Sequence, residues 1–193
     1  MPTTGFGFWT RPRDAESHLH LNAVEVHDGT LYALLNAYGV AANLTTEEGA
    51  LEHERLRGGH NLVIRGGGIA IVNDSFGKAV RFYDLKAGQL RRTIDLTEYE
   101  WTCDLIRGEV PMYWGKEALR KIGGIEGSVA KPLFVQGLAR REDTLFNGVS
   151  PASILQVNVT TGALVDTYQY SSNVHACIHG LAVLNGAAFQ AEA

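Results

Sequence analysis

The stretch Gly59-His60-Asn61-Leu62-Val63-Ile64-Arg65, followed after three glycines by Ile69-Ala70-Ile71-Val72-Asn73, decides the fold. A small or polar pair opens a short apolar strand, a glycine-rich turn follows, and a second apolar strand ends in Asn. The pattern or its first half recurs elsewhere along the chain, at His20-Leu21-Asn22-Ala23, Gln136-Gly137-Leu138-Ala139 and His179-Gly180-Leu181-Ala182. A unit that returns at a steady interval predicts a repeat architecture.

The unit that opens at Gly59 extends to four strands. After Asn73 come a turn, a strand at 79–84, a second turn at 86–89 and a last strand at 90–96. The segment VRFYDLKAGQLRRTIDL at 80–96 aligns without a gap through its turn with LQVNVTTGALVDTYQY at 155–170. Each copy is therefore predicted to be an antiparallel meander of four strands.

The first copy shows the hairpin signal most clearly. Val24 and Val26 alternate with Glu25 and His27, which is the period of a half-buried strand. Asp28-Gly29 is a strong two-residue hairpin turn, and 31–35 is the return strand. Residues 37–58 are less regular.

The spacing of the copies predicts the architecture. The aligned positions Asn22, Asn61, Gly137 and Gly180 are separated by 39, 76 and 43 residues. Two of these intervals match the length of about 40–45 residues of a four-stranded propeller blade. The long interval holds either a hidden blade that opens at Cys103-Asp104-Leu105 or an inserted loop with a helix at 116–122.

We therefore predict an all-β chain that forms a small β-propeller of about four to five four-stranded antiparallel blades. It is a single domain over 1–193, because stacking sheets around an axis buries faces that one sheet leaves open. The copy near 177–193 is short, so its outer strands would come from the N-terminal segment around Phe6 to Trp9 or from a partner chain. The predicted repeats lie near 17–58, 59–98, 133–176 and 177–193, with 99–132 as blade or insertion.

The amino-acid composition limits the kinds of partner that we expect. The 193 residues are 45% hydrophobic and 20% charged, as in globular proteins, and the net charge of -4 argues against nucleic acid as a ligand. The N-terminus lacks the pattern of a signal peptide, and no apolar run approaches the roughly 18 residues that cross a bilayer. These features predict a cytoplasmic protein without membrane contact.

Several short segments of the chain carry a resemblance, in this order: His20-Leu21-Asn22-Ala23, Gly59-His60-Asn61 with Ile71-Val72-Asn73-Asp74-Ser75, Phe134-Val135-Gln136-Gly137-Leu138-Ala139, Gly148-Val149-Ser150-Pro151, Val159-Thr160-Thr161-Gly162-Ala163-Leu164-Val165 and Gly180-Leu181-Ala182-Val183-Leu184-Asn185-Gly186. Their order resembles a family of bacterial conserved hypothetical propeller-like proteins with "PHSPR", "LWLLNSGTG", "GFTRGLAF", "FVGLSxP", "DLRTGEVV" and "DVAVLPG" segments. More distantly, the pattern looks like the gluconolactonase and strictosidine-synthase propellers. The Arg of the family's "FTRGL" is Gln136 in this chain. The resemblance implies the propeller fold and no particular reaction.

In a propeller, the start of each inner strand lies at the axis. The predicted small-molecule site therefore consists of the polar residues at those starts, which are His20, Asn22, His60, Asn61, Gln136 and His179. Neutral imidazoles that converge from different blades suit zinc, iron or copper, so His20, His60 and His179 are the candidate metal ligands. Two alternatives stay open: a polar funnel that binds a ligand without metal, and side chains that only cap the backbone around a wet channel.

Three functions remain in competition. One is a ligand-binding propeller, which as an enzyme would carry out metal-assisted hydrolysis or lyase chemistry on a small molecule. The second is a non-catalytic protein-interaction scaffold that forms a homo-oligomer, with the aromatic stretch 99–114 as its contact surface. The third is a shortened, inactive relative of a catalytic propeller. The sequence leaves open whether the protein is an enzyme.

Overall fold

The computed structural model describes residues 21–36, 38–56, 58–108, 122, 133–173 and 176–184. Its architecture is all-β, with three four-stranded antiparallel sheets among these residues. We call them sheets A, B and C in chain order. Sheet A contains β1 (Leu21–His27), β2 (Thr30–Leu35), β3 (Val40–Asn43) and β4 (Glu48–Glu52); sheet B contains β5 (Gly59–Arg65), β6 (Ile69–Asp74), β7 (Ala79–Asp84) and β8 (Gln89–Asp95); sheet C contains β9 (Leu138–Arg141), β10 (Thr144–Val149), β11 (Ser153–Asn158) and β12 (Leu164–Gln169).

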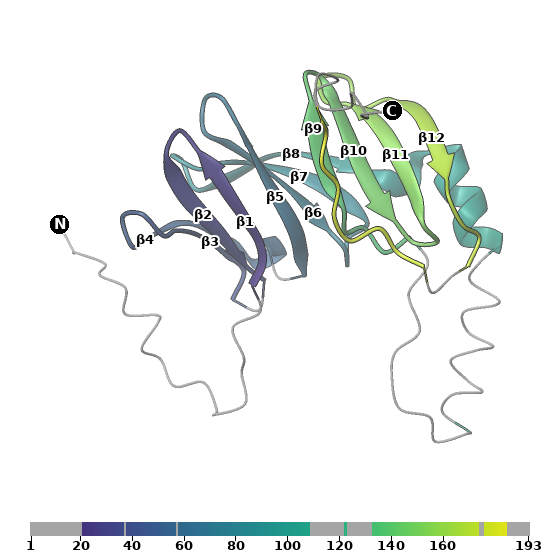
Figure 1. Ribbon diagram of the computed structural model, residues 1–193, viewed down its shortest axis with the longest axis horizontal. Coiled ribbons are helices and arrows are strands. Elements are labelled where there is room, and N and C mark those ends of the chain that lie inside the picture. The colour runs from purple at the N-terminus through teal and green to yellow at the C-terminus, as the bar shows by residue number, and fades with distance from the viewer. Residues whose placement is uncertain are drawn as a thin grey trace, which may run out of the picture.

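Each sheet is a meander in which every strand pairs with its neighbour in sequence. Figure 1 shows the three sheets side by side, with β4 of sheet A and β12 of sheet C at opposite ends of the molecule. The first strands of the sheets, β1, β5 and β9, lie nearest one another. The predicted repeat of four antiparallel strands is therefore confirmed for three copies, while the total number of blades stays a prediction.

The hairpin turns follow from local chemistry. Asp28 and Gly29 join β1 to β2 with φ values of 48° and 75°, the left-handed pair that a two-residue hairpin turn requires. Gly67 and Gly68 join β5 to β6 with φ values of 83° and 74°. Both predicted hairpins are confirmed.

The turn between the third and fourth strands has the same design in all three sheets. Asn43, Asp84 and Asn158 each end the third strand, and the side-chain oxygen of each accepts a hydrogen bond from a backbone N–H two or three residues on. Such turns are typical of Asn and Asp. The copy in sheet A was missed in the sequence, although Asn43-Leu44-Thr45-Thr46 matches Asn158-Val159-Thr160-Thr161.

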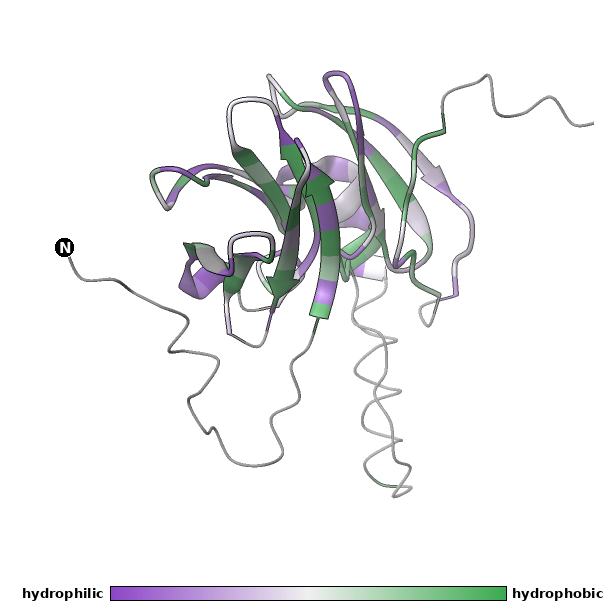
Figure 2. Cartoon of the chain, turned by 60° about the vertical axis from the view of Figure 1, so that its left-hand side comes forward, coloured by the Kyte–Doolittle hydropathy of each residue, from purple (hydrophilic) through white to green (hydrophobic). Residues whose placement is uncertain are grey.

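Two hydrophobic clusters hold the sheets together. Between sheets A and B, the cluster includes Leu34, Leu62 and Tyr83. Between sheets B and C, a larger cluster includes Val80 and Leu155. Figure 2 shows hydrophobic residues concentrated along the strands and hydrophilic residues at several hairpin tips. Alternation along each strand sends successive side chains to opposite faces, so sheet B packs against a neighbour on both sides.

The burial of β1 differs from the sequence expectation. Leu21, Val24 and Val26 are 54%, 52% and 67% exposed, whereas Glu25 and His27 are partly buried. The Glu25 carboxyl accepts a hydrogen bond from the backbone N–H of Ile64 in sheet B, and burial raises its pKa. The strand is confirmed, but its polar side faces sheet B. On the other side of sheet A, Leu35 and Val40 of β2 and β3 are buried, while the valines of β1 are exposed.

The long interval between sheets B and C is partly helical. Residues 100–108 form a helix, and Trp101, Leu105 and Ile106 pack against the core between sheets B and C. A helix at this place favours the insertion over an inner strand opening at Cys103. The remainder of the interval, including the predicted helix up to residue 121 and Trp114, lies outside the described residues. In the described part of the chain, no helix is both long and apolar enough to span a membrane.

Candidate functional site

The inner ends of the sheets meet through asparagine side chains. Asn22 at the start of β1 donates from Nδ2 to the carbonyl of Gly59, the first residue of β5, at 2.7 Å. Asn61 occupies the same place in β5, and its Nδ2 donates to the carbonyls of Gln136 at 2.5 Å and His179 at 2.9 Å. Each amide therefore reaches forward to the next inner segment of the chain.

The hydroxyl of Ser75 links His60 of sheet B to the segment before β9. The Nδ1 atom lies 2.7 Å from Ser75 Oγ and 3.0 Å from the carbonyl of Gly58. Ser75 is buried and donates its hydroxyl hydrogen to the carbonyl of Val135 in the neighbouring unit. Since a hydroxyl has one hydrogen to give, Nδ1 must carry its own hydrogen to satisfy Ser75 Oγ and the carbonyl. The imidazole also packs edge-on against Phe134, with 5.4 Å between ring centroids.

Gln136 is buried and forms hydrogen bonds through both its backbone and its side chain. It is 5% exposed, and its carbonyl accepts from Asn61 and, at 3.2 Å, from Asn73 Nδ2. Its side-chain Oε1 accepts from the Cys177 thiol at 3.1 Å. Burial raises the pKa of that thiol to about 11, so it stays protonated at neutral pH.

The segment 176–184 lies where the inner strand of a further blade is expected. The carbonyl of Ile178 accepts from the backbone N–H of Gly137 at 2.8 Å, and the Ile178 side chain packs over Gly148. Leu181 packs over Gly137. Figure 1 shows this yellow segment returning from β12 to run beside β9. It pairs with the described residues through few backbone bonds and is assigned no strand.

The structure brings five of the six predicted ligand-binding residues to one region and shows what they do there. Asn22, Asn61 and Gln136 join inner segments, His60 joins sheet B to the segment before β9, and His179 offers its carbonyl to Asn61. His20 lies outside the described residues. Among the residues that are described, no group of three His, Cys, Asp or Glu side chains is arranged to hold a metal ion. The His20, His60 and His179 site stays a prediction.

A buried ion pair went unrecognised in the sequence. Asp74 and Arg81 are each 7% exposed, with Arg81 Nε 2.7 Å from Asp74 Oδ2. Asp74 Oδ1 accepts from the backbone N–H of Gly77 at 2.7 Å, and Arg81 Nη1 donates to Thr93 at 3.0 Å. The pair ties β6, β7 and β8 together on the side of sheet B that faces sheet A. No local signal in the sequence marks Arg81, seven residues on, as the partner of Asp74.

A shallow polar pocket of about 350 Å³ lies at the outer rim between sheets B and C. Arg92 crosses it and donates to the carbonyls of Val159 at 2.6 Å and Thr160 at 2.9 Å. The Tyr99 hydroxyl donates to the carbonyl of Gly162 at 2.5 Å, and burial raises its pKa to about 12. The pocket therefore sits beside an Arg and a Tyr whose polar atoms already bind the backbone of sheet C.

Large apolar side chains are exposed on sheet A and near sheet C, at the two ends of the row of sheets. At one end is the side of β1 turned away from sheet B, which we call the far face of sheet A: Leu21, Val24 and Val26. At the other end we define the C end as Tyr168 on β12 and Leu184 on the segment 176–184, which are 60% and 57% exposed. Large exposed apolar side chains that lie together are typical of contact surfaces.

Comparison with known proteins supports the fold alone. Neither a family model nor a curated protein matches the sequence. The computationally designed Ika4 protein is 12% identical, with 89% of this chain and 85% of that chain covered and a TM-score of 0.53. The RRP9 WD40 repeats and U3-55K are each 14% identical over 88% of this chain, with TM-scores of 0.51. The chain spans 44% and 45% of those two chains, less than half of each. These likenesses show a β-propeller fold.

Proposed function

We propose that this protein is a non-catalytic interaction scaffold, and that the far face of sheet A is the surface that binds a protein partner. The observation that carries the proposal is the burial of β1. Its valines are exposed while Glu25 turns toward sheet B, although the repeat pattern is that of a strand with a buried apolar side. A neighbouring β-sheet would complete the alternation.

The chemistry at the axis supports the same conclusion. Polar side chains that were predicted to bind a ligand donate hydrogen bonds to backbone carbonyls of neighbouring segments, as Asn22 does to Gly59 and Asn61 does to Gln136. The Cys177 thiol is held protonated by burial, which makes it a poor nucleophile. These contacts correspond to the capping role that the sequence left open.

Burial of the far face of sheet A by a partner is expected to contribute substantially to the free energy of binding, although this surface is small. Full burial of a Val or Leu side chain contributes about 1.5–3 kcal/mol relative to leaving it in water. Leu21, Val24 and Val26 are all more than half exposed, so most of their contribution is still available to a partner. Asp28 and Gly29 at the tip of the hairpin are exposed and provide a polar rim.

Site-specific photo-cross-linking in the expressing cell tests this function. A photoreactive phenylalanine analogue in place of Val26 is expected to form a covalent adduct with a second polypeptide. The matched control carries the analogue in place of Lys86, which is exposed at the tip of the β7–β8 hairpin. Adducts from position 26 and not from position 86 support the proposal. Equal yields from both positions, or no adduct from position 26, overturn it.

A further inference from the structure

We propose that the junction of sheets B and C contains an internal hydration site, in which an ordered water molecule bridges the side chains of Asn73 and Asn147. This site lies in the interior of the molecule and is separate from the partner surface proposed on sheet A. Three buried polar atoms without hydrogen-bond partners, the register of β10 and one shared backbone carbonyl support it.

Asn73 and Asn147 are buried asparagines whose hydrogen bonding is incomplete. Both residues are 0% exposed. Asn73 Nδ2 donates to the carbonyls of Gln136 at 3.2 Å and Gly137 at 2.7 Å, but Asn73 Oδ1 accepts no hydrogen bond from the described residues. Neither Oδ1 nor Nδ2 of Asn147 has a partner among those residues. Buried amides are nearly always paired with protein groups or ordered water, because an unpaired group loses its hydration without compensation.

Both side chains point into the junction between sheets B and C. Asn73 of sheet B reaches the backbone just before β9, which places its amide on the side that faces sheet C. Asn147 pairs with Leu155, which belongs to the cluster between sheets B and C. Ile178 covers the neighbouring Gly148 on the opposite side of sheet C. Since successive side chains of a strand alternate between faces, Asn147 must face sheet B.

One backbone oxygen brings the two asparagines close together. The carbonyl of Gly137 accepts from Asn73 Nδ2 at 2.7 Å and from the backbone N–H of Gly148 at 2.8 Å. Gly148 directly follows Asn147 in β10, so the unpaired amide of Asn147 lies beside the end of the Asn73 side chain. A water molecule both donates and accepts hydrogen bonds, so one molecule can donate to Asn73 Oδ1 and bind the Asn147 amide at the same time.

The junction between sheets A and B shows that the repeat does not require a polar side chain at this place. Val72 occupies in β6 the position that Asn147 occupies in β10, because each pairs with a leucine of the first strand and faces the preceding sheet. Val72 is buried in the apolar cluster between sheets A and B. The amide of Asn147 therefore distinguishes the junction of sheets B and C, and water is the partner that suits it.

A crystal structure of the full chain at a resolution that shows ordered water tests the site directly. Wild type is expected to contain a water molecule within about 3.2 Å of Asn73 Oδ1 and of the Asn147 side-chain amide. The variant Asn147→Leu gives this position the apolar character of Val72, so it is expected to lack that water while Asn73 still donates to Gly137. The junction of sheets A and B is the internal control, because no water is expected beside Val72.

Three results would overturn the site. In wild type, two of them are a direct bond between the amides of Asn73 and Asn147, and an Asn147 amide bonded to the backbone with no water between the two side chains. The third is a water that keeps its place on Asn73 in Asn147→Leu, which would show that Asn147 does not hold it. If Asn147→Leu does not fold, the wild-type structure alone decides.

Discussion

Replacing Asp74 by Asn is expected to lower the free energy of unfolding by about 3–5 kcal/mol, the range measured when one partner of a buried ion pair is removed. The substitution keeps the shape of the side chain and leaves an oxygen for the N–H of Gly77. It leaves the Arg81 guanidinium, 7% exposed, without its counter-charge. Urea denaturation followed by circular dichroism measures the effect.

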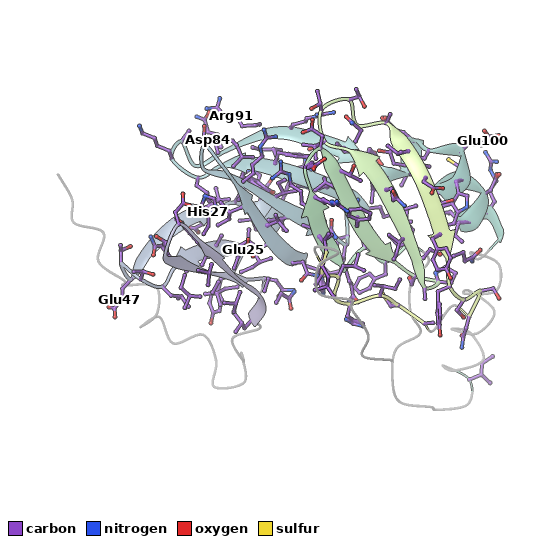
Figure 3. All side chains as sticks on the ribbon, turned by 45° about the horizontal axis from the view of Figure 1, so that its top comes forward. Glu25, His27, Glu47, Asp84, Arg91 and Glu100 are labelled. Atoms are coloured by element: carbon purple, nitrogen blue, oxygen red, sulfur yellow. The ribbon has the colours of Figure 1, made fainter. Side chains whose placement is uncertain are left out.

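The chain supplies its own control for this prediction. Asp84 and Arg91 have the same seven-residue separation and bond at 2.6 Å, but the Arg91 side chain is 53% exposed. Figure 3 shows this pair at the surface of the molecule. Asp84→Asn is expected to shift the urea midpoint far less than Asp74→Asn. Equal shifts for the two substitutions would show that burial does not govern these pairs and would contradict the expectation.

Replacing Gly148 by Ala is expected to destabilise the protein by about 1–3 kcal/mol, the usual cost of overpacking a tight contact. A Cβ atom at this position would lie 2.7 Å from the carbonyl oxygen and from the side chain of Ile178. The segment 176–184 must then move away from sheet C. In a Cys103→Ser background, faster maleimide labelling of Cys177 reports this movement, because the thiol loses its partly buried position beside Gln136.

Gly180 provides the matched control on the same segment. A Cβ added at Gly180 meets nothing within 4 Å, so Gly180→Ala is expected to leave both stability and the labelling rate close to wild type. Unchanged labelling of Cys177 in Gly148→Ala would contradict the docking of this segment on sheet C.

The pattern of the chain was sufficient to predict the local elements. The hairpins at Asp28-Gly29 and Gly66-Gly67-Gly68 and the aligned outer hairpins of sheets B and C are present as expected. The signals lie in residues that are neighbours in sequence: a turn that needs positive φ, an Asn or Asp that binds the next backbone amides, and alternation of side chains. Such signals need no knowledge of distant contacts. In the outer hairpin of sheet A, which was missed, Glu47 with a φ of 57° stands where the other two turns have Gly.

The roles of the inner-strand residues depend on partners far away in sequence. Asn61 and His179 are 118 residues apart, and Ser75 reaches Val135 across 60 residues. Sequence spacing placed these residues near the axis, but the direction of each hydrogen bond depends on how adjacent sheets are offset. The same limit applies to β1, where alternation predicted one apolar side and only the packing of sheets A and B shows that this side is exposed.

The yield of adducts from position 26 in single-substitution variants is the most direct measurement of whether the far face of sheet A, rather than the inner strand starts, contacts a partner. The yield is predicted to stay close to that of the unsubstituted chain in His60→Gln and to fall in Val24→Lys. His60 bonds to Ser75 beside the segment before β9 and Val24 lies on the far face of sheet A, so the two substitutions separate the two regions. An unchanged yield in Val24→Lys would contradict the account.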